Sequence, residues 1–346
     1  MTPIQRVCVI GGGGYVGSAL VPHLLDRGYQ VKVIDLFLFG RDVFSAVQNK
    51  RRLTCVQADM RNEQALRHEL KGMDAVIHLA CVSNDPSFEL DPELGKSINY
   101  DSMPGLLRAA ESCGIKRFIY ASSSSVYGVK DEPDVREEAV CDPLTDYSKY
   151  KLLCERLTRE YCGDKIEYVI VRPATVCGYS RRLRLDLTVN ILTIHALVKK
   201  EITVFGGKQL RPNINIKDMV EAYALLLEAP REKIHGQIYN VGTDNLTVME
   251  IAEKVKKQIG DEAVTLRIQP TNDIRSYHVN SDKIQRILGF RPRYNVEEAI
   301  QSLFEAYRAG KIEDPLNNPL YYNIKTMQNT NNIKNSLPDV EILQIQ

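Results

Sequence analysis

The most suggestive pair of side chains in the chain is a tyrosine and a lysine four residues apart, Tyr147 and Lys151. On a helix, positions i and i+4 share one face, so the phenol and the ammonium would lie side by side. A free tyrosine titrates at ~10, too high for a proton acceptor at neutral pH. A fixed ammonium lowers that pKa because it stabilises the phenolate. The spacing therefore predicts an acid/base tyrosine, although such pairs are also common on solvated helices.

Four consecutive serines, Ser122–Ser125, lie upstream of this pair. They follow the apolar run Phe118–Ala121, and the carboxyl end of a strand is where parallel sheets bind ligands. A hydroxyl there can donate to a carbonyl or alkoxide of a substrate while the tyrosine exchanges the proton. The alternative is that the serines form only a polar loop.

A glycine-rich segment near the N-terminus predicts a dinucleotide site. Gly11, Gly14 and Gly17 form a GxxGxxG pattern after the apolar run Val7–Ile10 and before a helix-like stretch. The first glycine allows a tight turn, the second allows a pyrophosphate to approach, and the third allows the helix to pack on the sheet. The helix N-terminus then faces the phosphates. A glycine triad alone is a weak signal, but here it has the strand–turn–helix context that the motif requires.

An acidic residue, Asp35, closes the second strand-like run. A carboxylate there accepts hydrogen bonds from both hydroxyls of the adenine ribose and repels the extra phosphate of NADP, so NAD is the expected cofactor. Asp35 could instead be a solvated turn residue, and Arg41 nearby is compatible with NADP. Asp59, after the third strand, suits either the adenine amine or the N-cap of the following helix.

Short apolar runs alternate with amphipathic stretches in the first half of the chain, and these elements would position the groups above. Such an alternation predicts a parallel sheet covered on both faces, with right-handed crossovers. The expected fold class is therefore α/β, a doubly wound parallel sheet of the Rossmann type. The strand-like runs are Val7–Ile10, Val31–Ile34, Leu53–Gln57, Ala75–Leu79, Phe118–Ala121 and Tyr168–Val171, and the helical stretches are Val16–Arg27, Asn62–Leu70, Ser102–Ser112 and Tyr147–Tyr161.

After Pro173 the rhythm changes, which predicts a smaller C-terminal α/β lobe for the substrate. We expect a cofactor domain at 1–173, mainly the substrate lobe at 174–314 and an irregular Asn-rich tail at 315–346, with further crossovers near 207–240. The elements expected there are helices at Leu185–Val198, Lys217–Glu228, Val248–Ile259, Asp282–Leu288 and Val296–Ala309, and strands at Ile202–Phe205, Gln237–Val241 and Val264–Ile268.

The overall composition argues against several classes of protein. Lysine and arginine total 45 against 44 acidic residues, so no strong field draws the chain to nucleic acid or to an anionic membrane. The longest apolar runs are strand-sized, and the first residues lead directly into a strand, which leaves no room for a signal peptide. The eight cysteines form no CxxC pair and are expected to be reduced thiols rather than disulfides or metal ligands. We therefore expect a cytoplasmic protein without a metal site.

With these motifs in place, the chain resembles the extended short-chain dehydrogenases/reductases, and among them the nucleotide-sugar epimerase/dehydratase family. The resemblance covers roughly residues 5–310 and includes the glycine, serine and Tyr–Lys motifs described above. The shorter matches are Ala58-Asp59-Met60, His78-Leu79-Ala80, Asn99, Arg172-Pro173 and Leu288-Gly289-Phe290.

The resemblance implies a catalytic triad and a cofactor site. In that family the hydroxyl residue three before the valine of the Val-Tyr-Gly motif completes the triad, which here is Ser123. Tyr147 is then the acid/base and Lys151 binds the nicotinamide ribose, whereas the position of His78 is structural. The cofactor-binding residues implied are Gly11, Gly14, Tyr15, Val16, Gly17, Asp35, Asp59, Met60, Leu79, Ala80, Asn99, Tyr147 and Lys151.

The resemblance also implies that arginines of the smaller lobe bind the diphosphate of a nucleotide sugar. Arg211 matches the family position, although Pro212-Asn213 replaces the usual Asp-Phe, and Arg275 is the second candidate. A guanidinium fork suits bidentate phosphate contacts. The cluster Arg181–Arg184 is either an anion clamp or a solvated loop. The expected substrate-binding residues are Ser83, Ser123, Ser124, Tyr147, Thr175, Asn190, Arg211 and Arg275.

The family includes several reactions, and Ser124 and Ser125 narrow the choice. The 4,6-dehydratases carry an Asp–Glu pair at these positions, and the glucuronate decarboxylases usually place Glu just before the Val-Tyr-Gly motif. With serines instead, the expected activity is NAD-dependent 4-epimerisation of a nucleotide sugar, with a 4-ketoreductase or a 4,6-dehydratase as alternatives. A non-catalytic NAD-binding scaffold or sensor is the alternative of another class, but such relatives typically lose the Tyr–Lys pair. The family further suggests a homodimer.

Overall fold

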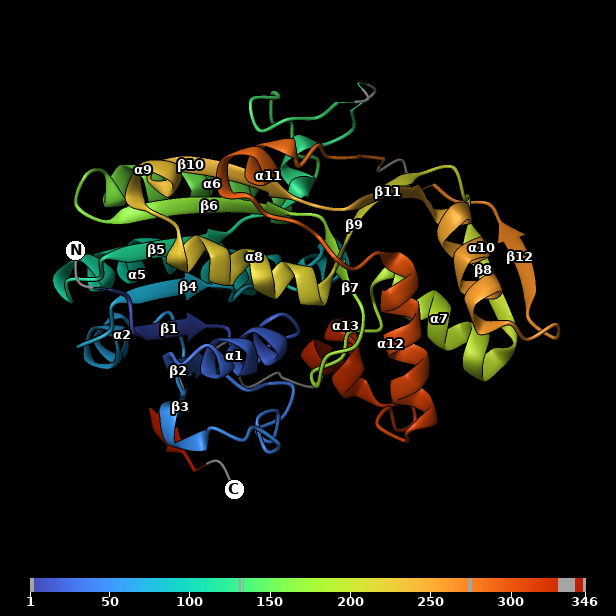
Figure 1. Ribbon diagram of the computed structural model, residues 1–346, viewed down its shortest axis with the longest axis horizontal. Helices are drawn as coiled ribbons and strands as arrows, with labels where there is room; N and C mark the ends of the chain where they lie inside the picture. The colour runs from blue at the N-terminus through green and yellow to red at the C-terminus, as the bar shows by residue number, and fades with distance from the viewer. Residues whose placement is uncertain (1–2, 131, 133, 273–275, 329–339, 345–346) are drawn as a thin grey trace.

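The computed structural model describes residues 3–130, 132, 134–272, 276–328 and 340–344, and it divides into a large sheet with its helices and a smaller lobe (Figure 1). The large sheet has the strand order β10-β6-β5-β4-β1-β2-β3-β13. Seven strands are parallel, and the edge strand β13 runs antiparallel to β3. The expected doubly wound fold is confirmed. The bounds are β1 (Arg6–Ile10), β2 (Gln30–Asp35), β3 (Leu53–Gln57), β4 (Ala75–His78), β5 (Arg117–Ala121), β6 (Glu167–Pro173), β10 (Gln237–Val241) and β13 (Glu341–Leu343).

Helices cover both faces of this sheet because successive strand residues point to opposite sides. Val7 and Val9 share one core with α1 (Gly17–Asp26) and α8 (Ile216–Glu228). Cys8 and Ile10 belong to the other core, which includes side chains of α2 (Glu63–Glu69), α5 (Met103–Ser112) and α6 (Asp146–Cys162). Most positions in these strands are apolar because both faces of the sheet are covered, which is why the sequence identified the strands well.

The smaller lobe contains two short sheets and several helices. One sheet has the order β11-β9-β7 and the other pairs β12 with β8. Between these strands the chain returns to the large sheet, because β10 pairs with β6. The bounds are β7 (Thr175–Cys177), β8 (Glu201–Phe205), β9 (Leu210–Asn215), β11 (Asp244–Thr247), β12 (Thr265–Gln269), α7 (Thr188–Lys199), α10 (Val248–Ile259), α11 (Asp282–Leu288) and α12 (Val296–Arg308).

Several elements of the structure have no counterpart in the sequence-based prediction. The strands β7, β9 and β11 are short and polar, and β9 contains Pro212, which is rare inside strands. The remaining short elements are α3 (Asp85–Glu89), α4 (Pro92–Lys96), α9 (Arg231–Ile234), a π-helical turn at Ser97–Asp101 and 3-10 turns at Lys50–Arg52, Ser124–Tyr127 and Pro319–Tyr321.

The C-terminal segment differs from the irregular tail that its composition predicted. Its described part contains α13 (Asn323–Gln328), which lies between the large sheet and the smaller lobe, and β13 at the edge of the sheet (Figure 1). Asparagine contributes here through its side chain: the Asn318 side chain accepts a hydrogen bond from the Leu320 N–H. An Asn-rich composition therefore does not exclude ordered structure where amides bond to backbone or neighbouring groups.

Candidate active site

A cavity of about 450 Å³ opens where the strand order of the large sheet reverses, at the carboxyl ends of β1, β2 and β4. This is the place where doubly wound sheets bind ligands. The large sheet contributes Gly11, Gly14 and Asp35 to its wall, α6 contributes Tyr147 and Lys151, and the smaller lobe adds residues from β7 and β9. Both lobes therefore form a single cavity.

The three motif glycines have different structural roles in the wall of the cavity. Gly11 has a φ of 82°, and a Cβ there would lie 2.4 Å from the backbone nitrogen of Ala80. At Gly17 a Cβ would lie 2.3 Å from the carbonyl oxygen of Gly12, so both positions require glycine for packing. At Gly14 the nearest atom to a Cβ is a carbonyl oxygen at 3.2 Å, and the residue lines the cavity. Its bare backbone leaves the close approach that a pyrophosphate needs, so the turn fits a dinucleotide.

Asp35 ends β2 and lines the cavity. Its carboxylate accepts hydrogen bonds from the N–H groups of Gly13 at 2.9 Å and Phe37 at 2.7 Å. Burial raises the pKa of Asp35, and these N–H groups act in the opposite direction. The carboxylate is therefore fixed in the wall and is not a solvated turn residue. Arg41 is exposed and pairs with Glu341 at 3.3 Å, on the edge strand β13.

Asp59 also lines the cavity, but it does not cap the following helix. Its carboxylate pairs with the guanidinium of Arg61 at 2.6 Å and accepts the Arg61 N–H at 2.8 Å. The N-cap of α2 is Asn62, whose side chain accepts a hydrogen bond from the Ala65 N–H at 3.0 Å. The N-cap alternative for Asp59 is therefore wrong.

The N-terminal half of α6 presents the tyrosine and the lysine to the cavity. The helix begins with a capping box between Thr145 and Ser148, which satisfies the first free N–H groups and fixes the orientation of the first turn. The Lys151 ammonium is buried, donates to the Ala121 carbonyl at 2.7 Å and lies 5.9 Å from the centre of the Tyr147 ring. The predicted pair is thus brought together on one side of the helix.

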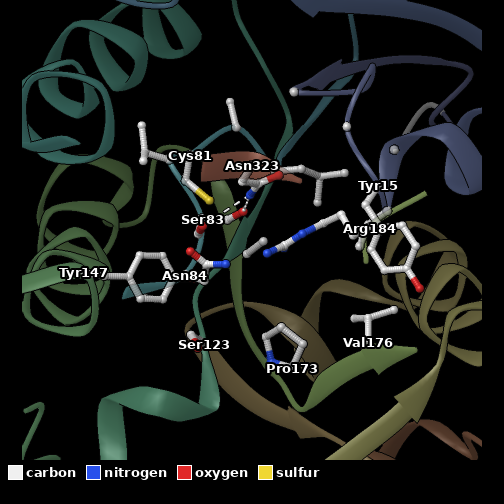
Figure 2. A pocket seen from close by; sticks show the side chains of 18 of the residues that line it. Tyr15, Cys81, Ser83, Asn84, Ser123, Tyr147, Pro173, Val176, Arg184 and Asn323 are labelled. Atoms are coloured by element: carbon white, nitrogen blue, oxygen red, sulfur yellow. Dashed lines mark hydrogen bonds between the residues drawn. The ribbon is translucent and has the colours of Figure 1, made fainter. Parts of the chain in front are cut away.

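Ser123 faces the same cavity from the segment that follows β5. In Figure 2 its side chain and the Tyr147 ring approach the open space from neighbouring directions. The Ser123 hydroxyl shares a hydrogen bond with the Ser125 hydroxyl at 2.8 Å and accepts the Ser125 N–H at 3.1 Å. The serines therefore form a 3-10 turn at the wall of the site rather than a solvated loop.

The surroundings of Tyr147 oppose its ionisation. Burial raises the pKa of this phenol well above its ordinary value, and the nearby Cys81 and Asp85 raise it further. Arg184 and the Ser123 hydroxyl act in the opposite direction but are outweighed. The phenol is therefore neutral until additional positive charge arrives, so its use as a base depends on a cationic ligand beside it.

His78 lies at the end of β4 but belongs to the core. Its ring centroid is 5.7 Å from that of Tyr120 and 6.3 Å from that of Phe118. Burial, together with the charge of Lys151, lowers the pKa of His78 to about 3, so the ring is neutral at physiological pH. These contacts are those of a packed side chain.

A buried polar network supports the floor of the site. The Arg172 guanidinium forms two hydrogen bonds to the Glu155 carboxylate, at 2.9 and 2.8 Å, and both side chains are almost fully buried. Glu155 also accepts the Ser122 hydroxyl at 2.6 Å. Arg172 donates to the Tyr127 hydroxyl at 2.9 Å, which donates to Asn240 at 2.7 Å. The network joins β6, α6, the end of β5 and β10.

Two predicted binding residues do not reach the cavity wall. The Asn190 side chain accepts the Gly178 N–H and donates to the Tyr15 hydroxyl and to the Arg184 carbonyl. The Asn99 side chain accepts the N–H of Val82 and donates to its carbonyl. Both amides thus hold backbone segments behind the site. Predicted residues that do line the cavity are Gly11, Gly14, Tyr15, Val16, Gly17, Asp35, Asp59, Met60, Leu79, Ala80, Ser83, Ser123, Ser124, Tyr147, Lys151, Thr175 and Arg211, whereas Arg275 lies outside the described residues.

The arginine cluster 181–184 contributes more to the cavity than a solvated loop would. Arg181 is exposed, whereas Arg182 and Arg184 line the cavity. Figure 2 shows the Arg184 side chain extending into the space between Tyr15 and Asn84. Arg184 pairs with Asp186 at 2.9 Å, and this carboxylate also accepts from Asn84 at 3.0 Å.

The match to a family model completes the description of the site. The model of the NAD dependent epimerase/dehydratase family matches residues 7–242. The chain belongs to this family. It is an enzyme of the epimerase/dehydratase type, and its cofactor is NAD.

Characterised members similar to this chain catalyse different reactions. It is 27% identical to the UDP-glucose 4-epimerase of Lactobacillus helveticus, over 88% of this chain and 98% of the relative. It is 29% identical to UDP-glucuronic acid decarboxylase 1 of Arabidopsis thaliana, over 88% and 70%. The solved UDP-glucuronic acid 4-epimerase of Bacillus cereus, in complex with UDP-glucuronic acid and NAD, superimposes with a TM-score of 0.80, 25% identity and coverage of 88% and 99%. Membership in the epimerase/dehydratase family thus leaves the reaction open.

Sequence reasoning missed several cavity residues of this epimerase/dehydratase. Asn84, Asp186, Tyr277 and Asn323 all line the wall. For the arginine cluster 181–184, the alternation of Arg182 and Arg184 with buried leucines was a detectable signal. Asn323 lies in the Asn-rich tail, where no motif marks it. Within the described part of the chain, no helix combines the length and apolarity needed to cross a membrane.

We predict that this enzyme binds NAD more tightly than NADP because of Asp35. Replacing Asp35 with serine should narrow the preference by about tenfold, or ~1.4 kcal/mol, since the carboxylate both accepts from the ribose and repels a phosphate. Isothermal calorimetry with both dinucleotides measures the ratio. Equal or tighter binding of NADP by the unmodified protein would contradict the role of Asp35.

We also predict that Glu155→Gln destabilises the fold by about 3 kcal/mol or more, because it leaves the buried Arg172 charge without its counter-ion. Urea denaturation followed by circular dichroism measures the change. Lys149→Ala on the same helix is the matched control, since its pair with Asp146 is exposed and should contribute less than about 1 kcal/mol. Equal decreases in the free energy of unfolding for the two substitutions would show that the Arg172–Glu155 network does not stabilise the protein around the site.

Proposed function

We propose that this enzyme is an NAD-dependent nucleotide-sugar 4-epimerase, which oxidises C4 of a nucleoside-diphosphate sugar and reduces it again on the opposite face. The observation that carries the proposal is the presence of serine at positions 124 and 125. An acidic residue there would direct the 4-keto intermediate into loss of water or decarboxylation. Ser124 is buried in the cavity wall, and the Ser125 hydroxyl bonds to Ser123. Neither group provides a second acid or base.

Other carboxylates of the wall are already engaged. Asp85 accepts the Thr145 hydroxyl at 2.6 Å and thereby supports the first turn of α6. Asp35 and Asp59 belong to the cofactor side of the proposal, and Asp186 pairs with Arg184. In the described part of the chain, each acid that lines the cavity thus has a hydrogen-bond partner, which supports a site limited to oxidation and reduction.

The proposed mechanism uses the three groups that the cavity brings together. Tyr147 removes the proton of the C4 hydroxyl as a phenolate, and the Ser123 hydroxyl donates a hydrogen bond to the C4 oxygen. Lys151, held by the Ala121 carbonyl, stabilises the phenolate. NAD, which the glycine turn and Asp35 would hold, would supply a positive charge near the phenol and serve as acceptor and donor of the C4 hydride.

Epimerisation requires the ketone to present its other face before the hydride returns. A diphosphate held by Arg211 would let the sugar turn while the nucleotide stays in place. Arg211 lines the cavity from β9, with its guanidinium 5.9 Å from the Tyr277 ring. The cavity wall also contains the small hydroxyl side chains of Ser83, Ser124 and Thr175. Several such groups can bond to the sugar in two orientations, whereas a single rigid acceptor would favour only one.

The nearest alternative is a 4-ketoreductase, which needs the same triad but releases its cofactor in each cycle. A 4,6-dehydratase would need an acid that positions 124 and 125 do not supply. A non-catalytic NAD-binding scaffold or sensor would have no reason to retain Ser123, Tyr147 and Lys151 together. The expected homodimer and the cytoplasmic location rest on the family resemblance and composition, and both stay proposals.

We predict that Tyr147→Phe lowers turnover by at least about a hundredfold, since acid–base catalysis contributes ~10²–10⁴ in rate. The ring still packs, so NAD affinity and thermal stability should be unchanged. Tyr150→Phe is the matched control, because Tyr150 lies on the same helix and stacks on Tyr100 instead. Turnover of Tyr147→Phe within about tenfold of the unmodified enzyme would refute the acid–base role.

We further predict that UDP-, GDP-, CDP- or dTDP-sugars are converted to their C4 epimers with only catalytic amounts of NAD. Nuclear magnetic resonance of the products identifies the new stereochemistry, and absorbance follows the reduced cofactor. Stoichiometric consumption of reduced cofactor would indicate a ketoreductase instead. A 4-keto-6-deoxy product would show that the acid-free serine turn does not prevent loss of water.

A further inference from the structure

Arg182 is a buried cation of the cavity wall that forms no ion pair with an acidic residue in the described part of the chain. Its side chain is only 4% exposed, and its guanidinium carbon lies 3.6 Å from the centre of the Phe39 ring. Among the described residues no carboxylate forms an ion pair with it, and its Nε is buried without a hydrogen-bond acceptor. Arg184, two residues away, is by contrast paired with Asp186. A buried charge left in this way is costly unless a ligand completes its contacts.

The position of Arg182 indicates which ligand that is. Its backbone N–H donates to the Ser18 hydroxyl at 3.2 Å, in the first turn of α1 directly after the glycine motif. Phe39 lies four residues beyond Asp35. The charges of Asp186 and Asp35 both act to raise the pKa of Arg182, and the charge of Arg182 acts to lower the pKa of Asp35. The guanidinium is therefore placed beside the turn and the carboxylate that fit the diphosphate and ribose of a dinucleotide.

The charge of Arg182 persists at physiological pH. Burial and the neighbouring Arg184 lower its pKa to about 9, which still leaves the guanidinium protonated at neutral pH. Stacking on the Phe39 ring adds a favourable contact that does not neutralise the charge. The side chain is thus a preorganised cation that lines the cavity, and its Nε has no acceptor among the described residues.

The C-terminal helix holds this arginine in place. Arg182 donates through Nη2 to the side-chain oxygen of Asn323 on α13. The Asn323 amide nitrogen donates to the Ser83 hydroxyl at 2.8 Å and to the Ser83 carbonyl at 3.3 Å, contacts that Figure 2 shows at the upper rim of the cavity. Asn323 is 4% exposed, so both of its polar ends are used inside the protein. The amide connects Arg182 to the segment after β4.

We propose that Arg182 binds the diphosphate of NAD and that Asn323 positions its guanidinium, which makes the C-terminal segment a part of the cofactor site. The diphosphate of the nucleotide sugar is the less suitable partner, because Ser18, Phe39 and Asp35 all surround the dinucleotide motif, whereas Arg211 lies in the smaller lobe. This contact would slow the release of NAD from the enzyme. Slow release is required of an enzyme that reuses one bound NAD in successive turnovers. The inference concerns binding alone and stands whether or not the net reaction is epimerisation.

The test compares Arg182→Gln with Arg181→Gln, its exposed neighbour. Calorimetry should show NAD and ADP-ribose binding to Arg182→Gln about ten- to a hundredfold more weakly, as for a lost charge-assisted hydrogen bond. Arg181→Gln and UDP binding should be unaffected. Added salt should weaken NAD binding more in the unmodified protein than in Arg182→Gln. NAD affinity within about twofold of the unmodified protein, or a loss confined to UDP, would overturn the proposal.

The role of Asn323 is tested by a double-mutant cycle. Asn323→Ala should speed NAD dissociation in stopped-flow measurements, but it should add nothing to Arg182→Gln, since it acts through that arginine. Lys325→Ala on the same helix is the control, because its ammonium bonds to the Leu316 carbonyl. Additive losses would overturn the positioning role. Thermal unfolding without cofactor identifies any variant that is poorly folded. If Arg182→Gln is poorly folded, Arg182→Lys replaces it, and a smaller loss of NAD affinity is expected.

Discussion

The arrangement of the proposed catalytic groups depends on the buried ion pair between Arg172 and Glu155. Two charges removed from water must satisfy one another closely, because each alone would be costly in the protein interior. Their geometry is met only when β6, the middle of α6 and the end of β5 lie at fixed distances. Tyr147 and Lys151 lie on the same helix as Glu155, and Ser123 follows the Ser122 that bonds to it. The relative position of phenol, ammonium and hydroxyl is thus a consequence of one electrostatic contact beneath them.

A second constraint is the desolvation of the Tyr147 phenol. Burial keeps the phenol protonated, and the groups that favour the phenolate do not compensate for it. Lys151 donates to the Ala121 carbonyl, which keeps its charge beside the ring without direct contact with solvent. In the proposed reaction, proton transfer by this tyrosine is therefore coupled to the arrival of positive charge in the cavity. Such coupling favours chemistry only after the oxidised cofactor is present.

The fold was predictable where a local pattern determines the structure, and the details of the site were not. The strand Leu53–Gln57 and the helix Val248–Ile259 match their predicted bounds, because the first is buried on both faces and the second begins with a capping box. The strand Leu210–Asn215 was missed because its proline and asparagines oppose strand propensity and only its neighbours in space stabilise it. Two asparagines were misjudged for a similar reason. Asn190 was predicted to contact the substrate but does not line the cavity, whereas Asn323 was not predicted and does line it. A side-chain amide bonds to whatever the fold brings near it, and those partners lie far away in the sequence.

The pairing of β13 with β3 has a consequence for how the molecule is made. The β3 edge of the sheet carries backbone groups that another chain could pair with, and β13 covers them. The covering strand comes from residues 341–343, whereas β3 is complete by residue 57. During synthesis the sheet therefore carries an open edge from the completion of β3 until residues 341–343 have been made. A chain that lacks residues 341–343 is thus more exposed to association through the β3 edge than one in which β13 has paired.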